Sequence, residues 1–333
     1  MRILVTGGAG FIGSALVRHL ISDTEHSVLN VDALTYAGNL KSLHQLEKHD
    51  RYRFEHVDIR NERGMEHCFK SFLPDRVIHL AAESHVDRSI KSSTAFLETN
   101  VLGTQSVLEQ SRKWSERNSD FQFIHVSTDE VYGDLDEGEL PFDEECNYAP
   151  SSPYAASKAA SDHLARAWMR TYGLPVIVTH CSNNYGPYHN IEKFIPNCIT
   201  RGLLGKEIPI YGDGGQTRDW LHVSDHVKAL TLLAEKGEAG QTYCIGGSCE
   251  LRNIDVAEMV CDVLLNQLGE RDYRSLLKKV KDRAGHDRRY AIDASKMKKE
   301  FGWEPKVEFS DGLRRTVRWF TENRDWWQGK AIY

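Results

Sequence analysis

The sequence lacks a long apolar run, closely spaced cysteines and an excess of positive charge. No apolar run approaches the roughly 20 residues of a membrane-spanning helix, so we expect no membrane anchor. The seven cysteines are scattered and form no Cys-x-x-Cys pair, which argues against a disulfide framework and a structural zinc site. A net charge of −6 argues against a general nucleic-acid partner, although a local basic pocket is compatible with it.

We also expect no targeting signal. Met1 leads straight into an apolar stretch that ends at glycines, with no charged leader and no cleavage site. Because unpaired cysteines suit a reducing compartment, we expect a cytoplasmic protein. The 15 histidines show no metal-ligand spacing, so we predict no metal site and interpret them as structural or surface residues.

Short β-branched runs alternate with amphipathic, helix-length stretches through the first 180 residues. This rhythm is typical of βαβ units and predicts an α/β fold with a Rossmann-type doubly wound parallel sheet. The predicted strands are 2–6, 28–32, 53–58, 77–80, 121–127 and 176–179. The predicted helices between them are 11–21, 62–72, 101–114 and 154–172.

After Thr179 the rhythm changes, because loop clusters at 183–187 and 212–215 separate shorter elements. We therefore predict a Rossmann domain over 1–180 and a smaller, mixed α/β lobe over 181–333. Helices are expected in this lobe at 194–204, 253–268 and 311–323. A further helix at 224–236 is expected to pack back on the first domain.

Gly8-Ala9-Gly10-Phe11-Ile12-Gly13 follows the first predicted strand and opens a helix. In that context the glycines permit a tight turn and a close approach of a diphosphate, and the helix N-terminus offers free N–H groups. Asp32 ends the second predicted strand, where a carboxylate can bind ribose hydroxyls and repel a 2′-phosphate, which favours NAD over NADP. Asp58, predicted to close the third strand, is a candidate for the adenine edge.

Tyr154 and Lys158 stand at i and i+4 of a predicted helix, so both side chains fall on one face. A nearby positive charge favours the phenolate, and we therefore expect Lys158 to lower the pKa of Tyr154 below its ordinary value of about 10. Such a pair can act as an acid and base toward a hydroxyl group. Its position after a dinucleotide-binding half and after Thr128 favours this function over a surface pair.

The glycine-rich start, Ser127-Thr128 and Tyr154-x-x-x-Lys158 together resemble the extended short-chain dehydrogenase/reductases that modify nucleotide sugars. Within that group the chain resembles the dTDP-glucose 4,6-dehydratase family, and the resemblance covers essentially its whole length. The segments that carry it are 31–40, 80–89, 127–133 and 218–223.

Asp129 and Glu130 decide the reaction class within this resemblance. An epimerase needs no acid or base beyond the tyrosine, whereas a dehydratase must also remove the C5 proton and protonate the departing C6 hydroxyl. Two adjacent carboxyl groups meet that need, because their environments can keep one protonated and the other ionised.

The resemblance implies a three-part reaction. Tyr154 takes the proton of the C4 hydroxyl, which Thr128 holds, while hydride passes from C4 to NAD. Glu130 then removes the C5 proton as Asp129 protonates the C6 hydroxyl, and water leaves. The hydride returns to C6 as C5 is reprotonated, so the product is a 4-keto-6-deoxy sugar nucleotide and NAD stays bound between turnovers.

The resemblance also implies the binding sites. The NAD site is Gly7, Gly10, Phe11, Ile12, Gly13, Asp32, Leu34, Thr35, Asp58, Ile59, Leu80, Ala81, Ala82, Ser84, Thr99, Tyr154, Lys158 and Asn184. The nucleotide-sugar site is Ser84, Thr128, Asn183, Glu192, Lys193, Phe194, Pro209, Tyr211, Arg218, Asn253, Arg283 and His286. Arg218 and Arg283 suit the diphosphate, since guanidinium groups form charge-assisted hydrogen bonds with it.

One segment departs from the family pattern. Between Tyr188 and Glu192 the chain reads His189-Asn190-Ile191, where a more aromatic, proline-containing link is usual, and Phe194 stands where an aliphatic residue is common. This leaves open thymidine or uridine as the base, and glucose or another hexose as the sugar.

Three alternatives therefore remain: a UDP-sugar 4,6-dehydratase, a UDP-sugar 4-epimerase, and a silent NAD-binding sensor. The carboxyl pair argues against the epimerase, and the intact catalytic tyrosine and lysine argue against the sensor. The family also implies a homodimer through the helices around 94–114 and 154–172.

Overall fold

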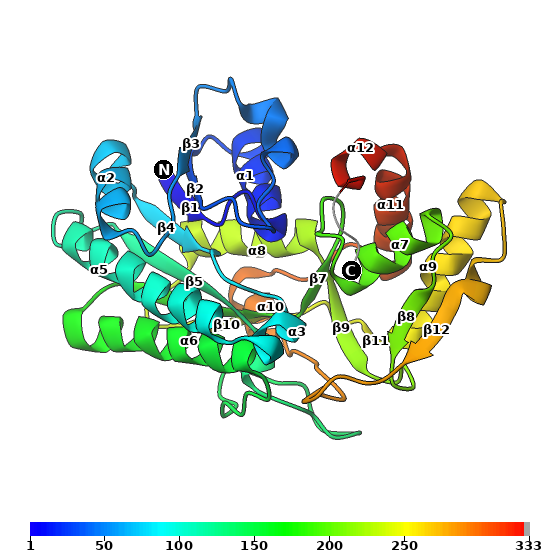
Figure 1. Ribbon diagram of the computed structural model, residues 1–333. Helices are drawn as coiled ribbons and strands as arrows, with labels where there is room; N and C mark the ends of the chain where they lie inside the picture. The colour runs from blue at the N-terminus through cyan, green and yellow to red at the C-terminus, as the bar shows by residue number, and fades with distance from the viewer. Residues whose placement is uncertain (330–333) are drawn as a thin grey trace.

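The computed structural model describes residues 1–329, which form two lobes (Figure 1). Residues 330–333, the end of the predicted smaller lobe, lie outside the described residues. The first lobe is built on one parallel sheet in the order β10-β6-β5-β4-β1-β2-β3. Its strands are β1 Arg2–Thr6, β2 Ser27–Asp32, β3 Tyr52–His56, β4 Arg76–His79, β5 Gln122–Thr128, β6 Val176–Cys181 and β10 Thr242–Ile245.

The strand order reverses between β1 and β4, which is where a doubly wound sheet binds its ligand. The predicted fold class is confirmed. The helices of this lobe are α1 Phe11–Asp23, α2 Glu62–Phe72, α3 Val86–Lys91, α4 Thr94–Phe96, α5 Thr104–Ser115, α6 Pro153–Tyr172, α8 Val223–Lys236 and α10 Ser295–Phe301. Short helical turns are η1 Leu40–Leu46, the π-helix η2 Leu97–Gly103 and η3 Asp129–Val131.

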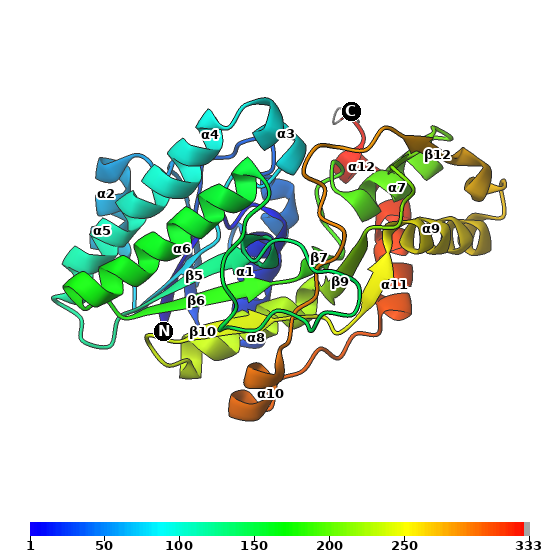
Figure 2. The same cartoon turned by 90° about the horizontal axis from the view of Figure 1, so that it is seen from below.

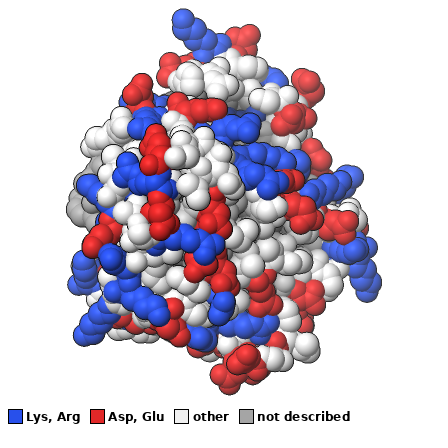
Figure 3. Space-filling view, turned by 90° about the vertical axis from the view of Figure 1, so that its right-hand side faces the viewer, with Lys and Arg blue, Asp and Glu red and all other residues white. Residues whose placement is uncertain are grey.

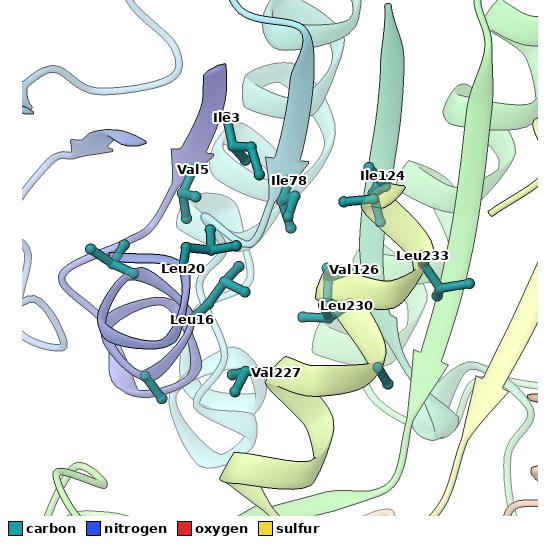
Figure 4. Close-up of a cluster of buried hydrophobic side chains, with 14 of the residues drawn as sticks. Ile3, Val5, Leu16, Leu20, Ile78, Ile124, Val126, Val227, Leu230 and Leu233 are labelled. Atoms are coloured by element: carbon teal, nitrogen blue, oxygen red, sulfur yellow. The ribbon is translucent and has the colours of Figure 1, made fainter. Parts of the chain in front are cut away.

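Helices cover both faces of the sheet because alternate side chains of each strand are apolar on opposite sides. Ile3 and Val5 of β1 are buried with α1 and α8, as Figure 4 shows. Leu4, between them, is buried with α2, α5 and α6 on the other face. Figure 2 shows α5 and α6 side by side across that second face.

The helix α6 illustrates how the sequence sets an element's ends. Ser152 caps its N-terminus by accepting a hydrogen bond from the backbone N–H of Ala155, and Pro153 begins the first turn. Gly173 ends the helix in a left-handed conformation with φ of 70°. Tyr154 and Lys158 are thereby fixed in the first two turns.

The second lobe packs α7 Phe194–Leu203, α9 Asn253–Leu268 and α11 Phe309–Glu322 around its own apolar core. Its small sheets are β11 Glu250–Arg252, β9 Thr217–His222 and β7 Asn183–Tyr185 in one, and β12 Leu277–Val280 with β8 Ile208–Tyr211 in the other. The remaining elements are η4 Tyr273–Leu276 and α12 Arg324–Trp327. On the face seen in Figure 3, acidic and basic side chains are interspersed.

Three elements beyond residue 180 belong to the first lobe. The helix α8 packs on α1, as the sequence predicted. In addition, β10 extends the sheet beside β6, and α10 packs on β10. The prediction from sequence assigned β10 and α10 to the second lobe. A four-residue strand and a seven-residue helix are too short for their hydrophobic periodicity to show where they pack.

The helix predicted at 101–114 differs in its first turns, which form the π-helix η2 before α5 begins at Thr104. Gly103 explains why the chain approaches its neighbours so closely here, since an added Cβ would lie 2.6 Å from Cδ1 of Ile59. Within residues 1–329, we find no helix of the length and apolarity that crossing a membrane requires.

Leu230 tests the packing of α8 on the sheet. Its side chain is fully buried in the core shown in Figure 4. We expect Leu230→Ala to lower the free energy of unfolding by about 2–5 kcal/mol, because the cavity it leaves can relax only in part. Leu265→Ala is the control, since Leu265 is 44% exposed on α9. Equal effects in denaturant unfolding would contradict the assignment of α8 to this core.

Candidate active site

A cavity of about 1030 Å³ lies between the two lobes at the carboxyl ends of the parallel strands. It brings together every predicted site residue except Leu34. Leu34 instead adopts φ of 51°, and its backbone N–H donates to Oδ1 of Asp32 at 2.8 Å. Its contribution is therefore to orient the carboxylate of Asp32.

The glycine turn after β1 fits a dinucleotide. Gly7 has φ of 71°, and a Cβ there would lie 2.7 Å from the backbone nitrogen of Ala81. Gly10 is the N-cap of α1 and provides no side chain to bond the first N–H groups of the helix, which face the cavity at Phe11 and Ile12. Free N–H groups at a helix N-terminus are donors for a diphosphate.

Two carboxylates line the cavity at, or just beyond, the ends of the neighbouring strands β2 and β3. The backbone N–H of Ala9 donates to Oδ2 of Asp32 at 2.9 Å, so Asp32 is held against the glycine turn. Asp58 lies two residues beyond β3, and its Oδ2 is 2.7 Å from Nη2 of Arg60. The Arg60 guanidinium lowers the pKa of Asp58, so the candidate for the adenine edge already forms an ion pair.

Asn100 is a buried residue that the sequence analysis missed. Its Oδ1 accepts from the backbone N–H of Glu83, and its Nδ2 donates to the Glu83 carbonyl and to Oγ of Ser157. The segment after β4 is thus fixed to α6. Across the cavity, Nζ of Lys193 donates to the carbonyl of Ser84 at 2.6 Å.

Tyr154 and Lys158 lie on the same face of α6 as predicted, but the predicted effect on the tyrosine is wrong for the protein alone. Burial raises the pKa of Tyr154 well above its usual value, and Glu130, Cys181 and Asp129 raise it further, while a hydrogen bond with Thr128 lowers it. Nζ of Lys158 donates to the Val126 carbonyl at 2.9 Å. In the protein alone, burial therefore outweighs any effect of Lys158 on the pKa of Tyr154.

Asp129 and Glu130 follow β5 in the turn η3 and line the cavity beside Thr128. Burial raises the pKa of Asp129 well above its usual range, and Glu130 and Asp219 add to the rise. Burial also raises the pKa of Glu130, but Arg283, Lys193 and Arg218 oppose that rise. Asp129 is therefore the more readily protonated of the two carboxyl groups, and the three cations make Glu130 the more acidic one.

A polar network behind β5 supports these residues, and the sequence analysis missed it. Asp162, fully buried one turn after Lys158, accepts from Oγ of Ser127 at 3.0 Å and pairs with His125 and His180, each at 3.0 Å. Its carboxylate raises the pKa of Lys158, which burial lowers more strongly. The i, i+4 spacing from Lys158 was the available signal.

The second lobe supplies the cations. Arg218 is buried, its Nη2 donates to the Asp287 carbonyl at 2.9 Å, and its guanidinium lies 4.3 Å from the ring centroid of Tyr290. Nη1 of Arg283 is 3.5 Å from Oδ1 of Asp87, and its buried Nε has no hydrogen-bond partner among the described residues. Both can therefore offer donors to an anion.

The remaining predicted substrate residues line the same end of the cavity. The hydroxyl of Tyr211 donates to Oδ2 of Asp87 at 3.2 Å, and Nδ1 of His286 lies 2.6 Å from Oδ1 of Asp282. Glu192 is engaged by Arg88, whose Nη2 is 3.1 Å from Oε2. The other members of this group are Asn183, Phe194, Pro209 and Asn253.

This geometry defines a dinucleotide-dependent enzyme of the short-chain dehydrogenase/reductase type. The family model for GDP-mannose 4,6 dehydratase matches residues 4–316, and the chain belongs to that family. A protein from Escherichia coli named dTDP-glucose 4,6-dehydratase is 52% identical, with 98% of this chain and 96% of the relative covered. A relative of the same name from Neisseria meningitidis serogroup B is 54% identical, with 98% and 95% covered. The predicted resemblance is confirmed.

Solved structures agree with the sequence relatives. A crystal structure of DesIV (dTDP-glucose 4,6-dehydratase) from Streptomyces venezuelae with NAD and TYD bound has a TM-score of 0.92 and is 46% identical, with 99% of this chain and 100% of that chain covered. A UDP-glucose 4-epimerase from Thermus thermophilus in complex with NAD has a TM-score of 0.87 and is 30% identical, with 97% and 100% covered. The same scaffold thus carries two reactions, and the residues of the site must distinguish them.

Buried histidines give the stability a definite pH dependence. Burial lowers the pKa of His125 and His222 to about 4 and that of His226 to about 3. An unfolded histidine binds a proton below about pH 6.5, so the unfolded state then binds more protons than the folded one. The free energy of unfolding must fall as the pH falls from about 6.5 to 4, by about 1.4 kcal/mol per pH unit for each such histidine.

His226→Asn tests this dependence, because its amide can still donate to Oδ1 of Asn184, which Nδ1 of His226 contacts at 2.9 Å. We expect the slope of unfolding free energy against pH between about 6 and 4.5 to fall by about one proton. The exposed His67→Asn is the control and should keep the original slope. An unchanged slope in His226→Asn would mean that this ring is protonated in the folded protein.

Proposed function

We propose that this protein is an NAD-dependent dTDP-glucose 4,6-dehydratase, a hydro-lyase that forms dTDP-4-keto-6-deoxyglucose. The observation that carries the proposal is the pair of buried Asp129 and half-buried Glu130, which lines the cavity with Thr128 and Tyr154. The names of the relatives and the NAD in the related structures support the same activity. A 4-epimerase on this scaffold would have no task for the two carboxyl groups.

Bound NAD would supply reversible hydride acceptance and a positively charged ring. Tyr154 binds the C4 hydroxyl together with Thr128 and removes its proton. In the protein alone its phenol is neutral, because burial and the two carboxyl groups oppose its ionisation. Positive charge in the loaded cavity, beside buried Lys158, favours the phenolate and makes Tyr154 a base at neutral pH.

The carboxyl pair performs the elimination. Glu130, whose ionised form is stabilised by three cations, removes the C5 proton once C4 is a ketone. Asp129 remains protonated and gives its proton to the leaving C6 hydroxyl. Its Oδ1 accepts from the Thr128 hydroxyl at 3.1 Å, while its buried Oδ2 has no partner among the described residues and is available for the proton.

The two lobes divide the binding. The first lobe holds NAD against the glycine turn and Asp32, and the second lobe holds the nucleotide diphosphate at Arg218 and Arg283. Tyr211, Phe194 and Pro209 provide flat or apolar surfaces near the base. A UDP-sugar dehydratase remains the second candidate, since these residues do not select thymidine by a contact of their own.

The proposal includes a homodimer and a cytoplasmic location. Leu97 and Leu102 of η2 are 51% and 60% exposed, beside the paired helices α5 and α6 (Figure 2). A second copy could cover these apolar side chains in a four-helix contact. All seven cysteines are free, which suits a reducing compartment.

The substrate test is direct. We expect the purified protein, with no added cofactor, to remove one water from dTDP-glucose, as followed by mass spectrometry. UDP-glucose, supplied separately at the same concentration, should react more slowly. A faster reaction with UDP-glucose would reassign the base, and an isomerised sugar of unchanged mass would show an epimerase. No turnover after adding NAD would contradict the proposal.

The carboxyl pair can be tested by isosteric amides. Asp129→Asn and Glu130→Gln remove the acid and the base, and each should lower kcat by about 10²–10⁴-fold while substrate binding changes little. Glu137→Gln, an exposed carboxyl group in the loop that follows, is the control and should retain full activity. Full activity in both active-site variants would exclude their proposed roles.

A further inference from the structure

Arg88 on α3 connects two parts of the protein that lie on opposite sides of the cavity. Its guanidinium carbon is 3.8 Å from the ring centroid of Tyr36, in the loop after β2. Its Nη2 is 3.1 Å from Oε2 of Glu192, in the segment before α7. One side chain thus contacts the first-lobe loop and the second lobe together.

The loop that carries Tyr36 belongs to the cofactor site. It begins at Asp32, and its residues Thr35 and Gly38 line the cavity. The backbone N–H of Asn39 donates to the Ala9 carbonyl at 2.9 Å, so the loop is also joined to the glycine turn. A dinucleotide bound along this surface would therefore lie against the loop.

Glu192 fixes the other end of the contact. Its side chain is only 10% exposed, and Nε2 of His85 lies 3.6 Å from the same Oε2. A buried carboxylate is costly without a bonded cation, so Glu192 holds Arg88 in place. Arg88 suits both partners, because a planar guanidinium can stack on a ring and donate in its own plane.

We propose that Arg88 is a positioning residue that retains NAD, because it holds the Tyr36 loop closed over the cofactor and attaches it to Glu192 of the second lobe. This rests on the proposed function, in which the hydride returns to the sugar in every turnover and the cofactor never needs to leave. Arg88 acts through Tyr36 and takes no part in proton or hydride transfer.

The test measures the release of NAD from the purified holoenzyme by ultrafiltration and chromatography of the filtrate. Arg88→Ala should release NAD about tenfold faster than the unchanged protein, as expected for the loss of a stacked and hydrogen-bonded guanidinium. Saturating NAD should restore kcat, since the catalytic groups are intact. A kcat that stays low at saturation would show a damaged site and overturn the proposal.

Tyr36 provides matched variants that do not disturb Glu192. Tyr36→Phe keeps the ring under Arg88 and should retain NAD, whereas Tyr36→Ala should release it as Arg88→Ala does. Lys91→Ala removes the next cation of α3 and should keep the original release rate. Release at the original rate from both Arg88→Ala and Tyr36→Ala would overturn the inference. A holoenzyme that contains no NAD and binds none when it is added would instead refute the proposed function, and this inference with it.

Discussion

Burial of ionisable groups at the carboxyl end of β5 is the constraint on which the rest of the site depends. Thr128, Asp129, Tyr154 and Lys158 are each buried. In such surroundings a charge is stable only beside a partner of opposite sign, so the ionisation of each group is decided by its neighbours. The fold therefore determines which of these groups carry a charge, because it decides which cations and carboxyl groups lie near each of them.

The two carboxyl groups show how this works, since both are desolvated, but three cations act on Glu130 and only Arg218 of these acts on Asp129. Arg218, Arg283 and Lys193 all come from the second lobe, whereas Asp129 and Glu130 come from the first. The second lobe thus lines the cavity and also supplies the cations that lower the pKa of Glu130. Asp162 plays the corresponding role behind the sheet, because it opposes the loss of charge on buried Lys158.

The sequence predicted the fold class and most element positions, because glycine spacing and strand periodicity are local signals. The family resemblance supplied most site residues, and all of the predicted ones except Leu34 line the cavity. It placed β10 and α10 in the wrong lobe, because sheet order is a long-range property. It gave Tyr154 a lowered pKa, because the sequence shows the adjacent lysine but not the burial or the facing carboxyl groups. Asn100 was missed for the same reason, since its partners are distant in sequence or on another element.

The reaction proposed for this site places unusual demands on cofactor binding. A dehydrogenase exchanges its dinucleotide after every turnover, so a cavity that opens readily serves it. A dehydratase that takes a hydride from C4 and returns it to C6 is harmed by such opening, because losing the reduced cofactor leaves an oxidised sugar that cannot be completed. The same cavity must still admit a nucleotide sugar and release the product. Separate contacts for the two ligands would meet both needs: Arg88 joins the Tyr36 loop to Glu192, whereas Arg218 and Arg283 are the proposed contacts of the diphosphate.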